Sequence, residues 1–191
     1  MVGCDGCAKA HDSGQSLRLA GGWSVGHYGG GEGFLGWLAL QTVEHRLGLT
    51  DLTLDEAARL GPILHGLEKG VYNYWQSRDR PIGRVYVMYF LEGLLEKKRT
   101  NGRWHLHFHI VPRFEELKPS MTGKKDVLGD TISGVDAYLI AKLRANRREF
   151  QLPSDLDRKT VEMAYGRGEL QRREFAIVQG VVWASGLSAS W

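Results

Sequence analysis

The chain has 191 residues, 42% of them hydrophobic and 25% charged, which is ordinary for a soluble globular protein with its own core. The formal net charge of +3 suits an anionic ligand such as a nucleotide, but it is too small to indicate nucleic-acid binding. No stretch approaches the roughly 20 apolar residues of a membrane span, and the first twelve residues contain no apolar signal segment. We therefore expect a cytoplasmic protein without a membrane partner.

Both cysteines of the chain lie near its N-terminus, where Cys4 and Cys7 form a Cys-x-x-Cys pair. Two cysteines in one short segment do not make a disulfide framework. A thioredoxin-like redox pair normally lies between a strand and a helix, and no strand is predicted before Cys4. A structural zinc site needs four ligands, so two more would have to come from elsewhere. From the residues alone, a redox pair, half of a zinc site and a chance pairing all stay open.

Short strands are predicted after this pair. Residues 16–28 read as one or two strands with a turn at Gly21-Gly22, and residues 37–43 read as a buried strand. The glycine-rich residues 29–36 lie between them. No dinucleotide or phosphate-loop fingerprint follows these glycines, so a flexible connection is favoured over a phosphate-gripping loop.

A long helix comes next. Thr53 and Glu56 form a capping box, which predicts a helix that starts near Leu54 and continues to about Gln76. Pro62 lies inside it and should bend it, because proline removes one intrahelical hydrogen bond. Apolar residues at helical spacing predict the face that is buried: Ala57, Leu60, Leu64, Leu67, Val71 and Trp75.

The remainder of the chain is predicted as one more strand before the histidines and mainly helices after them. Residues 83–91 are rich in Val and Tyr, as strands are. Residues 114–132 read as an irregular connection and 133–148 as an amphipathic helix. A second helix is predicted to start near residue 153, and a third covers about 169–183.

The most informative stretch is residues 104–113, WHLHFHIVPR, in which histidines alternate with apolar residues. Strict period-two alternation predicts a half-buried strand. Successive side chains point to opposite faces, so His105, His107 and His109 share one face and the apolar residues enter the core. Pro112 is expected to end the strand. Nothing in folding requires three histidines here, so a catalytic role is favoured over a solvated face or a purely metal-binding pair.

This stretch resembles the signature of the histidine triad family, His-φ-His-φ-His-φ-φ with φ apolar, whose members are nucleotidyl hydrolases and transferases. Residues 36–61 resemble the family's strand–Lys/Arg–His–helix segment, and most closely that of bacterial members with Gly-Trp where many others have Gly-His. The likeness points to the diadenosine polyphosphate hydrolase-like bacterial branch. It covers residues 1–113 and implies an α+β fold, an antiparallel sheet with a packed helix. Residues 114–191 would be a C-terminal helical extension packed on this core as one domain.

The resemblance also implies a metal site. Zinc-containing members bind the ion through an N-terminal Cys-x-x-Cys, the histidine that ends the buried strand and the first histidine of the triad. By position, these ligands are Cys4, Cys7, His45 and His105. Two cysteines and two histidines make a closed tetrahedral set, so the implied zinc is structural.

By the same resemblance, His107 is the nucleophile that attacks the α-phosphorus, and His109 binds the α-phosphate or the bridging oxygen. The implied substrates are dinucleoside polyphosphates or nucleoside phosphoramidates, cleaved through a covalent nucleotidyl-histidine. The substrate can carry Mg²⁺, although the reacting centre requires none. Many members have a Gln four residues before the first histidine; Asn101 stands here, and Arg103 could compensate, so both are expected substrate contacts. Family members are often homodimers.

Two alternatives stay open at this point. The first is a non-catalytic nucleotide-binding module with the same fold, which Asn101 in place of the usual Gln favours. The second is a metal-dependent enzyme in which His105, His107 and His109 jointly hold a catalytic ion. The pattern does not distinguish hydrolysis from phosphorolysis, and it does not fix the base preference.

Overall fold

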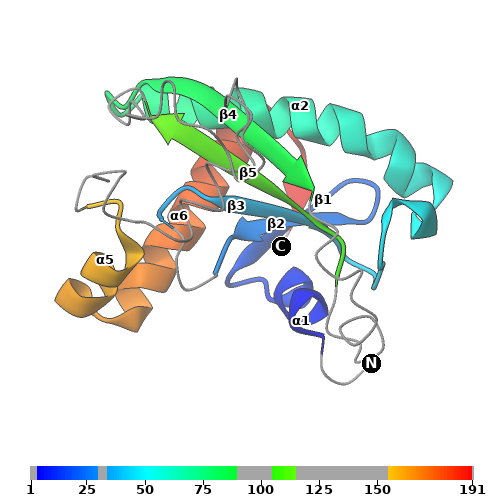
Figure 1. Cartoon of the computed structure of the whole chain (residues 1–191), viewed down its shortest axis with the longest axis horizontal. Helices are drawn as coiled ribbons and strands as arrows, with labels where there is room; N and C mark the ends of the chain where they lie inside the picture. The colour runs from blue at the N-terminus through cyan, green and yellow to red at the C-terminus, as the bar shows by residue number, and fades with distance from the viewer. Residues whose placement is uncertain (1–3, 30–33, 90–104, 115–154, 191) are drawn as a thin grey trace, which may run out of the picture.

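The computed structural model describes residues 4–29, 34–89, 105–114 and 155–190, and they form an α+β protein with one antiparallel sheet (Figure 1). This confirms the predicted fold class. The strand order in the sheet is β4-β5-β3-β2-β1-β6. The strands are β1 Ser16–Leu19, β2 Trp23–His27, β3 Leu38–Thr42, β4 Ile82–Tyr89, β5 His107–Phe114 and β6 Ala189–Ser190. The helices are α1 Asp5–His11, the 3₁₀ turn η1 Leu49–Asp51, α2 Leu54–Gln76, α5 Arg158–Tyr165 and α6 Arg167–Ser185.

The first two strands form a hairpin, as predicted. Its turn is made by Gly21 and Gly22, whose φ angles of 70° and 73° lie in the left-handed region that glycine adopts without strain. Leu19 then pairs with Trp23 across the hairpin. The next strand, β3, pairs antiparallel with β2 and carries the buried side chains predicted for residues 37–43.

Helix α2 has the predicted ends. The Thr53 side chain accepts the Glu56 backbone N–H, and the Glu56 carboxylate accepts the Thr53 backbone N–H, which completes the capping box. The predicted buried face is partly wrong, because Ala57 is exposed and the burial is shifted around the helix. Helix α6 contributes to the shift, because it packs closely against a small residue of α2; a Cβ on Gly70 would lie 2.3 Å from the Val181 carbonyl oxygen. The buried apolar side chains of α2 are Ile63, Leu67, Val71, Tyr74 and Trp75.

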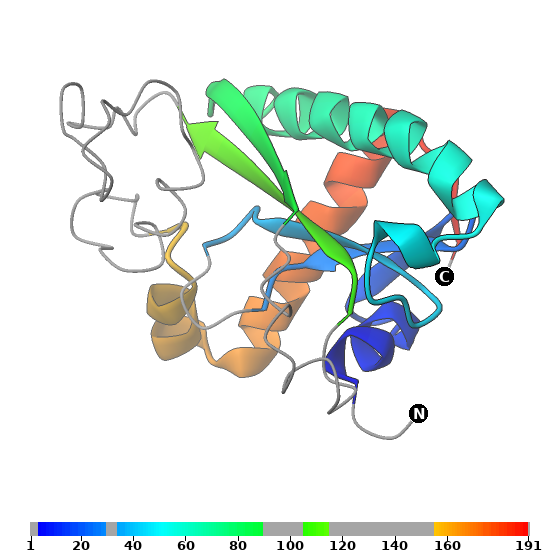
Figure 2. The same cartoon turned by 45° about the vertical axis from the view of Figure 1, so that its right-hand side comes forward.

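Two of the predicted C-terminal helices are present. Helix α5 begins at Arg158 with Asp157 as its N-cap, later than the predicted start near residue 153. Helix α6 covers the predicted residues 169–183 with short additions at both ends. Figure 2 shows α6 passing behind the strands to reach α2. The predicted connection at 114–132 and helix at 133–148 lie outside the described residues. Within the described part, no helix has both the length and the apolar composition needed to span a bilayer.

The histidine strand lies between β4 and β3. Phe108 pairs with Leu40 and His107 pairs with Gln41, so the side chains alternate between the two faces as predicted. The predicted start of the strand is wrong, because β5 begins at His107 and His105 lies before it. The strand is also not half-buried as predicted, because His109 is buried as well as Phe108. The expectation that Pro112 ends the strand is wrong, because β5 continues to Phe114. Pairing with β3 stops at Ile110, and beyond it Pro112 lies opposite β4, where its missing N–H costs no bond to β3.

Candidate functional site

The four residues expected to bind a metal lie together. The Cys7 Sγ is 3.4 Å from His45 Nδ1 and 3.3 Å from His105 Nδ1, and the Cys4 Sγ is 3.5 Å from His105 Nδ1. Sulfur and nitrogen ligands of one tetrahedral zinc ion lie roughly 3.6 Å apart, given bonds of about 2.3 and 2.1 Å. All four donor atoms fall within 4.8 Å of one another. This cluster could therefore hold a metal ion.

The short helix α1 places the two thiols of this cluster. Cys4 is its N-cap, and the Cys7 backbone N–H donates to the Cys4 sulfur at 3.3 Å. Gly6 lies against the ring of His105, and a Cβ at that position would be 2.5 Å from His105 Cβ. Real Cβ contacts are not so short, so only glycine lets α1 approach. The sequence analysis did not single out Gly6, because a glycine inside a Cys-x-x-Cys carries no signal of its own.

Burial sets the protonation of the cluster. It lowers the pKa of His105 to about 4, so this imidazole is neutral at pH 7. The His105 Nε2–H donates to the Thr42 carbonyl at 2.8 Å, which leaves the lone pair on Nδ1, the atom facing the sulfurs. Burial, with the adjacent Cys4, raises the pKa of the Cys7 thiol to about 11. A thiolate at Cys7 at neutral pH therefore requires a cation beside it, as metal coordination supplies.

The second and third histidines meet on the face of the sheet beside this cluster. His107 Nδ1 lies 2.8 Å from the His105 carbonyl oxygen, and a carbonyl only accepts, so Nδ1 carries the proton. The lone pair of neutral His107 is then on Nε2. This atom lies 3.2 Å from His109 Nε2, and the two rings meet edge to face with centroids 4.7 Å apart.

Trp37 determines which nitrogen of His109 carries the proton. Its indole Nε1–H donates to His109 Nδ1 at 3.0 Å, and an indole nitrogen cannot accept. Neutral His109 therefore carries its proton on Nε2 and points it at His107 Nε2. The side chain of His109 is 1% exposed and that of Trp37 is fully buried. Sequence reasoning placed Trp37 at the start of a buried strand and, by resemblance, in a Gly-Trp pair where many family members have Gly-His. Neither observation indicated that the indole orients a histidine.

A hollow of about 280 Å³ opens beside His107, which is half-buried at its wall. We call it the histidine hollow. Most of its lining is small or neutral and polar, which leaves room for a sugar or a base rather than for another charge. Apart from the two histidines His105 and His107, it is lined by Asp5, Gly6, Lys9, Gln15, Ser16, Gly26, His27, Tyr28, Gly29, Ala39 and Gln41.

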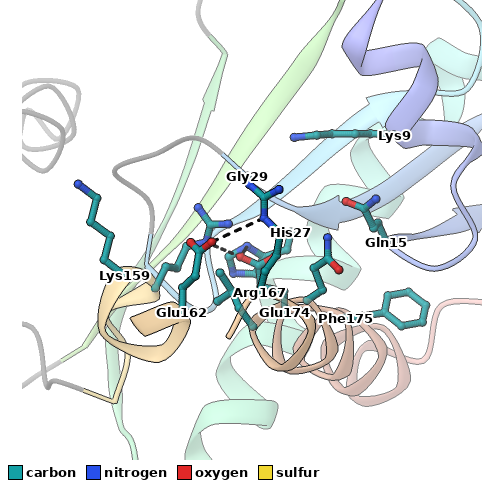
Figure 3. A pocket seen from close by; sticks show the side chains of 12 residues that line it. Lys9, Gln15, His27, Gly29, Lys159, Glu162, Arg167, Glu174 and Phe175 are labelled. Atoms are coloured by element: carbon teal, nitrogen blue, oxygen red, sulfur yellow. Dashed lines mark hydrogen bonds and ion pairs between the residues drawn. The ribbon is translucent and has the colours of Figure 1, made fainter. Parts of the chain in front are cut away.

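A second hollow of about 350 Å³ adjoins the first and is shown in Figure 3. We call it the basic hollow, because four cationic side chains line it against the two carboxylates of Glu162 and Glu174. It shares Lys9, Gln15, His27 and Gly29 with the histidine hollow, and α5 and α6 supply the rest of its wall. Its cationic residues are Lys9, Arg158, Lys159 and Arg167. The sequence analysis did not assign residues of the C-terminal helices to the site.

The charges in the basic hollow are only partly compensated. Arg158 forms an ion pair with Glu174, and Arg167 Nε lies 3.6 Å from the Glu162 carboxylate. Lys9 and Lys159 form no ion pair with the described residues, and Figure 3 shows them on opposite sides of the hollow. Burial lowers the pKa of His27 to about 3, so that ring is neutral. The surplus positive charge therefore persists at neutral pH and favours an anionic ligand.

The predicted substrate contacts Asn101 and Arg103 lie outside the described residues. Of the expected site residues, the structure brings together the four of the metal cluster and the pair His107 and His109. No protein-family model matches the chain, and no curated protein matches it.

Proposed function

We propose that this protein is a nucleotidyl hydrolase or transferase of the histidine triad type. It would cleave at the α-phosphate of a nucleoside phosphoanhydride or a related ester through a covalent nucleotidyl-histidine. The observation that carries the proposal is the hydrogen-bond chain from Trp37 to the His105 carbonyl. It presents the lone pair of His107 and the N–H of His109 to one point on the sheet.

In the first step the Nε2 of His107 attacks the α-phosphorus. A P–N bond forms, the bond from phosphorus to the leaving group breaks, and the leaving group departs with the electron pair. The His105 carbonyl keeps accepting the Nδ1–H of His107, and it thereby stabilises the positive charge that develops on the ring. Because the His107 lone pair is then engaged in the P–N bond, the Nε2–H of His109, held in place by Trp37, would donate to a phosphoryl oxygen, whose charge grows in the transition state.

In the second step water attacks the phosphorus of the nucleotidyl-histidine. A P–O bond forms, the P–N bond breaks, and Nε2 of His107 recovers its electron pair. The proton of the water passes to solvent, and the mononucleotide leaves. With inorganic phosphate as acceptor, the same intermediate would give a nucleoside diphosphate, so the chemistry of the two histidines suits hydrolysis and phosphorolysis alike.

The Cys4, Cys7, His45 and His105 cluster would hold a structural zinc ion. The donor set fits zinc, since thiolate sulfur and imidazole nitrogen are its preferred ligands and four protein ligands leave no open position. The ion would tie α1 to the start of the histidine strand. The small and mostly uncharged lining of the histidine hollow suits a nucleoside, and the surplus of cations in the basic hollow suits its phosphates.

Incubation with diadenosine tetraphosphate, with and without phosphate, tests this function. We expect AMP and ATP from hydrolysis, or ADP and ATP only when phosphate is present. His107→Ala should reduce turnover by more than about a thousandfold, because no other group replaces the nucleophile. The variant should keep its metal content and its melting temperature. Turnover at the wild-type rate in His107→Ala would exclude the mechanism, and AMP binding without any turnover would favour a binding module.

A further inference from the structure

Building on the function proposed above, we propose that Trp37 restricts the enzyme to leaving groups that depart without receiving a proton. The substrates are then phosphoanhydrides, such as dinucleoside polyphosphates, and not phosphoramidates. Trp37 acts through His109, so it is a positioning residue that determines specificity.

Trp37 and His109 meet in a buried contact. The indole N–H of Trp37 points at His109 Nδ1 from 3.0 Å, and both side chains are enclosed by the core. A proton on Nδ1 would face the indole proton, so His109 cannot become an imidazolium while this contact lasts. Loss of the Nε2 proton would instead create a buried imidazolate anion, which burial strongly disfavours. His109 can therefore donate a hydrogen bond but cannot give up a proton.

This restriction separates the two substrate classes. When His107 attacks a phosphoramidate, the departing amine nitrogen must gain a proton, since an amide anion is far too basic to leave. When it attacks an anhydride, a phosphate oxygen leaves with the electron pair as an ordinary oxyanion. A hydrogen bond from His109 is enough for the second reaction and not for the first. General acid catalysis typically contributes about 10²–10⁴ in rate, which sets the size of the expected preference.

The positive charge of the basic hollow also favours phosphoanhydride substrates over phosphoramidates. A polyphosphate leaving group is anionic, and Lys9, Lys159 and Arg167 place positive charge next to the histidine hollow. Lys9 lines both hollows, so its charge lies beside both of them. A neutral amine leaving group gains nothing from this field.

The test compares kcat/KM for diadenosine tetraphosphate and for adenosine 5′-phosphoramidate. We expect the wild type to prefer the anhydride by at least about a hundredfold. In Trp37→His the new imidazole can accept as well as donate, so His109 can take up a proton. We expect the phosphoramidate rate of this variant to rise at least about tenfold relative to the anhydride rate, and to fall as the pH rises through the histidine range.

Trp23→His is the matched control. Trp23 is also fully buried and also donates its indole N–H, to the Glu56 carbonyl at 2.9 Å, but it does not contact His109. It should leave the substrate preference unchanged. If a Trp37 variant does not fold, the ratio of the two kcat/KM values in the wild type still tests whether the enzyme prefers the anhydride. Equal cleavage of both substrates in a His107-dependent reaction would overturn this inference and leave the proposed function standing, whereas cleavage of neither would overturn both.

Two arginines of α6 allow the effect of the basic hollow on anhydride cleavage to be tested with a matched control. Arg167 and Arg172 both lie on α6, both are largely exposed, and each pairs with one glutamate, Glu162 and Glu169 respectively. Only Arg167 lines the hollow. We expect Arg167→Glu to lower kcat/KM for diadenosine tetraphosphate about tenfold, as loss of a charge-assisted contact does, and Arg172→Glu to lower it far less. Equal effects of the two substitutions would exclude the hollow from leaving-group selection.

Discussion

Two histidines of the stretch, His105 and His107, use the same residue type for opposite purposes. At His105, the Nε2–H donates to the Thr42 carbonyl, so its lone pair faces two cysteine sulfurs. At His107, two residues along the chain, the Nδ1–H donates to the His105 carbonyl, so the lone pair is on Nε2, which faces the N–H of His109 from a ring that lines the histidine hollow. The role of each histidine thus follows from which of its nitrogens a carbonyl occupies.

The position of a histidine in this stretch is therefore not enough to infer whether it binds a metal or acts as a nucleophile. His27 extends the comparison, because both of its nitrogens are used. Its Nε2 accepts the Gly36 N–H at 2.9 Å, and its Nδ1–H donates to the Tyr28 carbonyl at 3.1 Å. With no lone pair left to offer, this buried imidazole is structural by the same criterion. The predictions below separate the three kinds of histidine.

The largest loss of stability is expected from substitutions in the cluster of Cys4, Cys7, His45 and His105. Cys7→Ser and His45→Ala should each remove the bound metal and lower the free energy of unfolding by at least about 3 kcal/mol, because metal binding is coupled to folding. His65→Ala, an exposed histidine on α2, is the control and should change neither quantity. Metal analysis of the purified proteins and denaturant titration make the comparison. Full metal content in both cluster variants would contradict the assignment.

Gly6→Ala tests whether α1 must lie against His105. The new Cβ would lie 2.5 Å from His105 Cβ, so the cluster should open and the free energy of unfolding should fall by about 1–3 kcal/mol. Gly61→Ala is the matched control, because a Cβ at Gly61 of α2 meets nothing within 4 Å. It should be neutral or mildly stabilising, since alanine favours a helix. A melting curve and a metal titration of each variant suffice; equal behaviour of the two would refute the steric argument.

The smallest effect concerns His27. Burial holds its folded-state pKa at about 3, below the ordinary value of 6.5, so the unfolded chain binds an extra proton between these values. The contribution of neutral His27 to the free energy of unfolding is therefore fully present above pH 6.5 and is lost as the pH drops toward 3. The loss from pH 7 to pH 5 is about 2 kcal/mol. His27→Gln should remove that part of the slope, while the neighbouring Glu174, Arg158 and Lys9 remain. Parallel pH dependences of the unfolding free energy in both proteins would rule out this role.

Much of this architecture could be predicted from the sequence. The alternation of histidines with apolar residues predicted the histidine strand and the face that enters the core. The capping box of Thr53 and Glu56 predicted the start of α2. Both features depend on residues that are neighbours in the chain. The cluster of Cys4, Cys7, His45 and His105 was predicted from a family resemblance, and its four residues do lie together. No spacing rule could have joined residues that far apart in sequence.

What escaped prediction depends on packing between distant segments. The shifted buried face of α2 depends in part on α6, and the continuation of β5 through Pro112 depends on where β3 stops. The indole of Trp37 lies 72 positions from His109 in the chain, and only the sheet register brings the two together. Contacts of this kind have no periodicity, so they emerge only from the folded chain.

Trapping the covalent intermediate would test the role of His107 most directly. Diadenosine tetraphosphate would be mixed with the enzyme, the reaction stopped in base within one turnover, and the peptides mapped by mass spectrometry. We predict one adenylyl group on His107, absent from His107→Ala, whose metal content stays intact. Rapid turnover with no adduct on His107, or an adduct on another residue that survives in His107→Ala, would contradict the account.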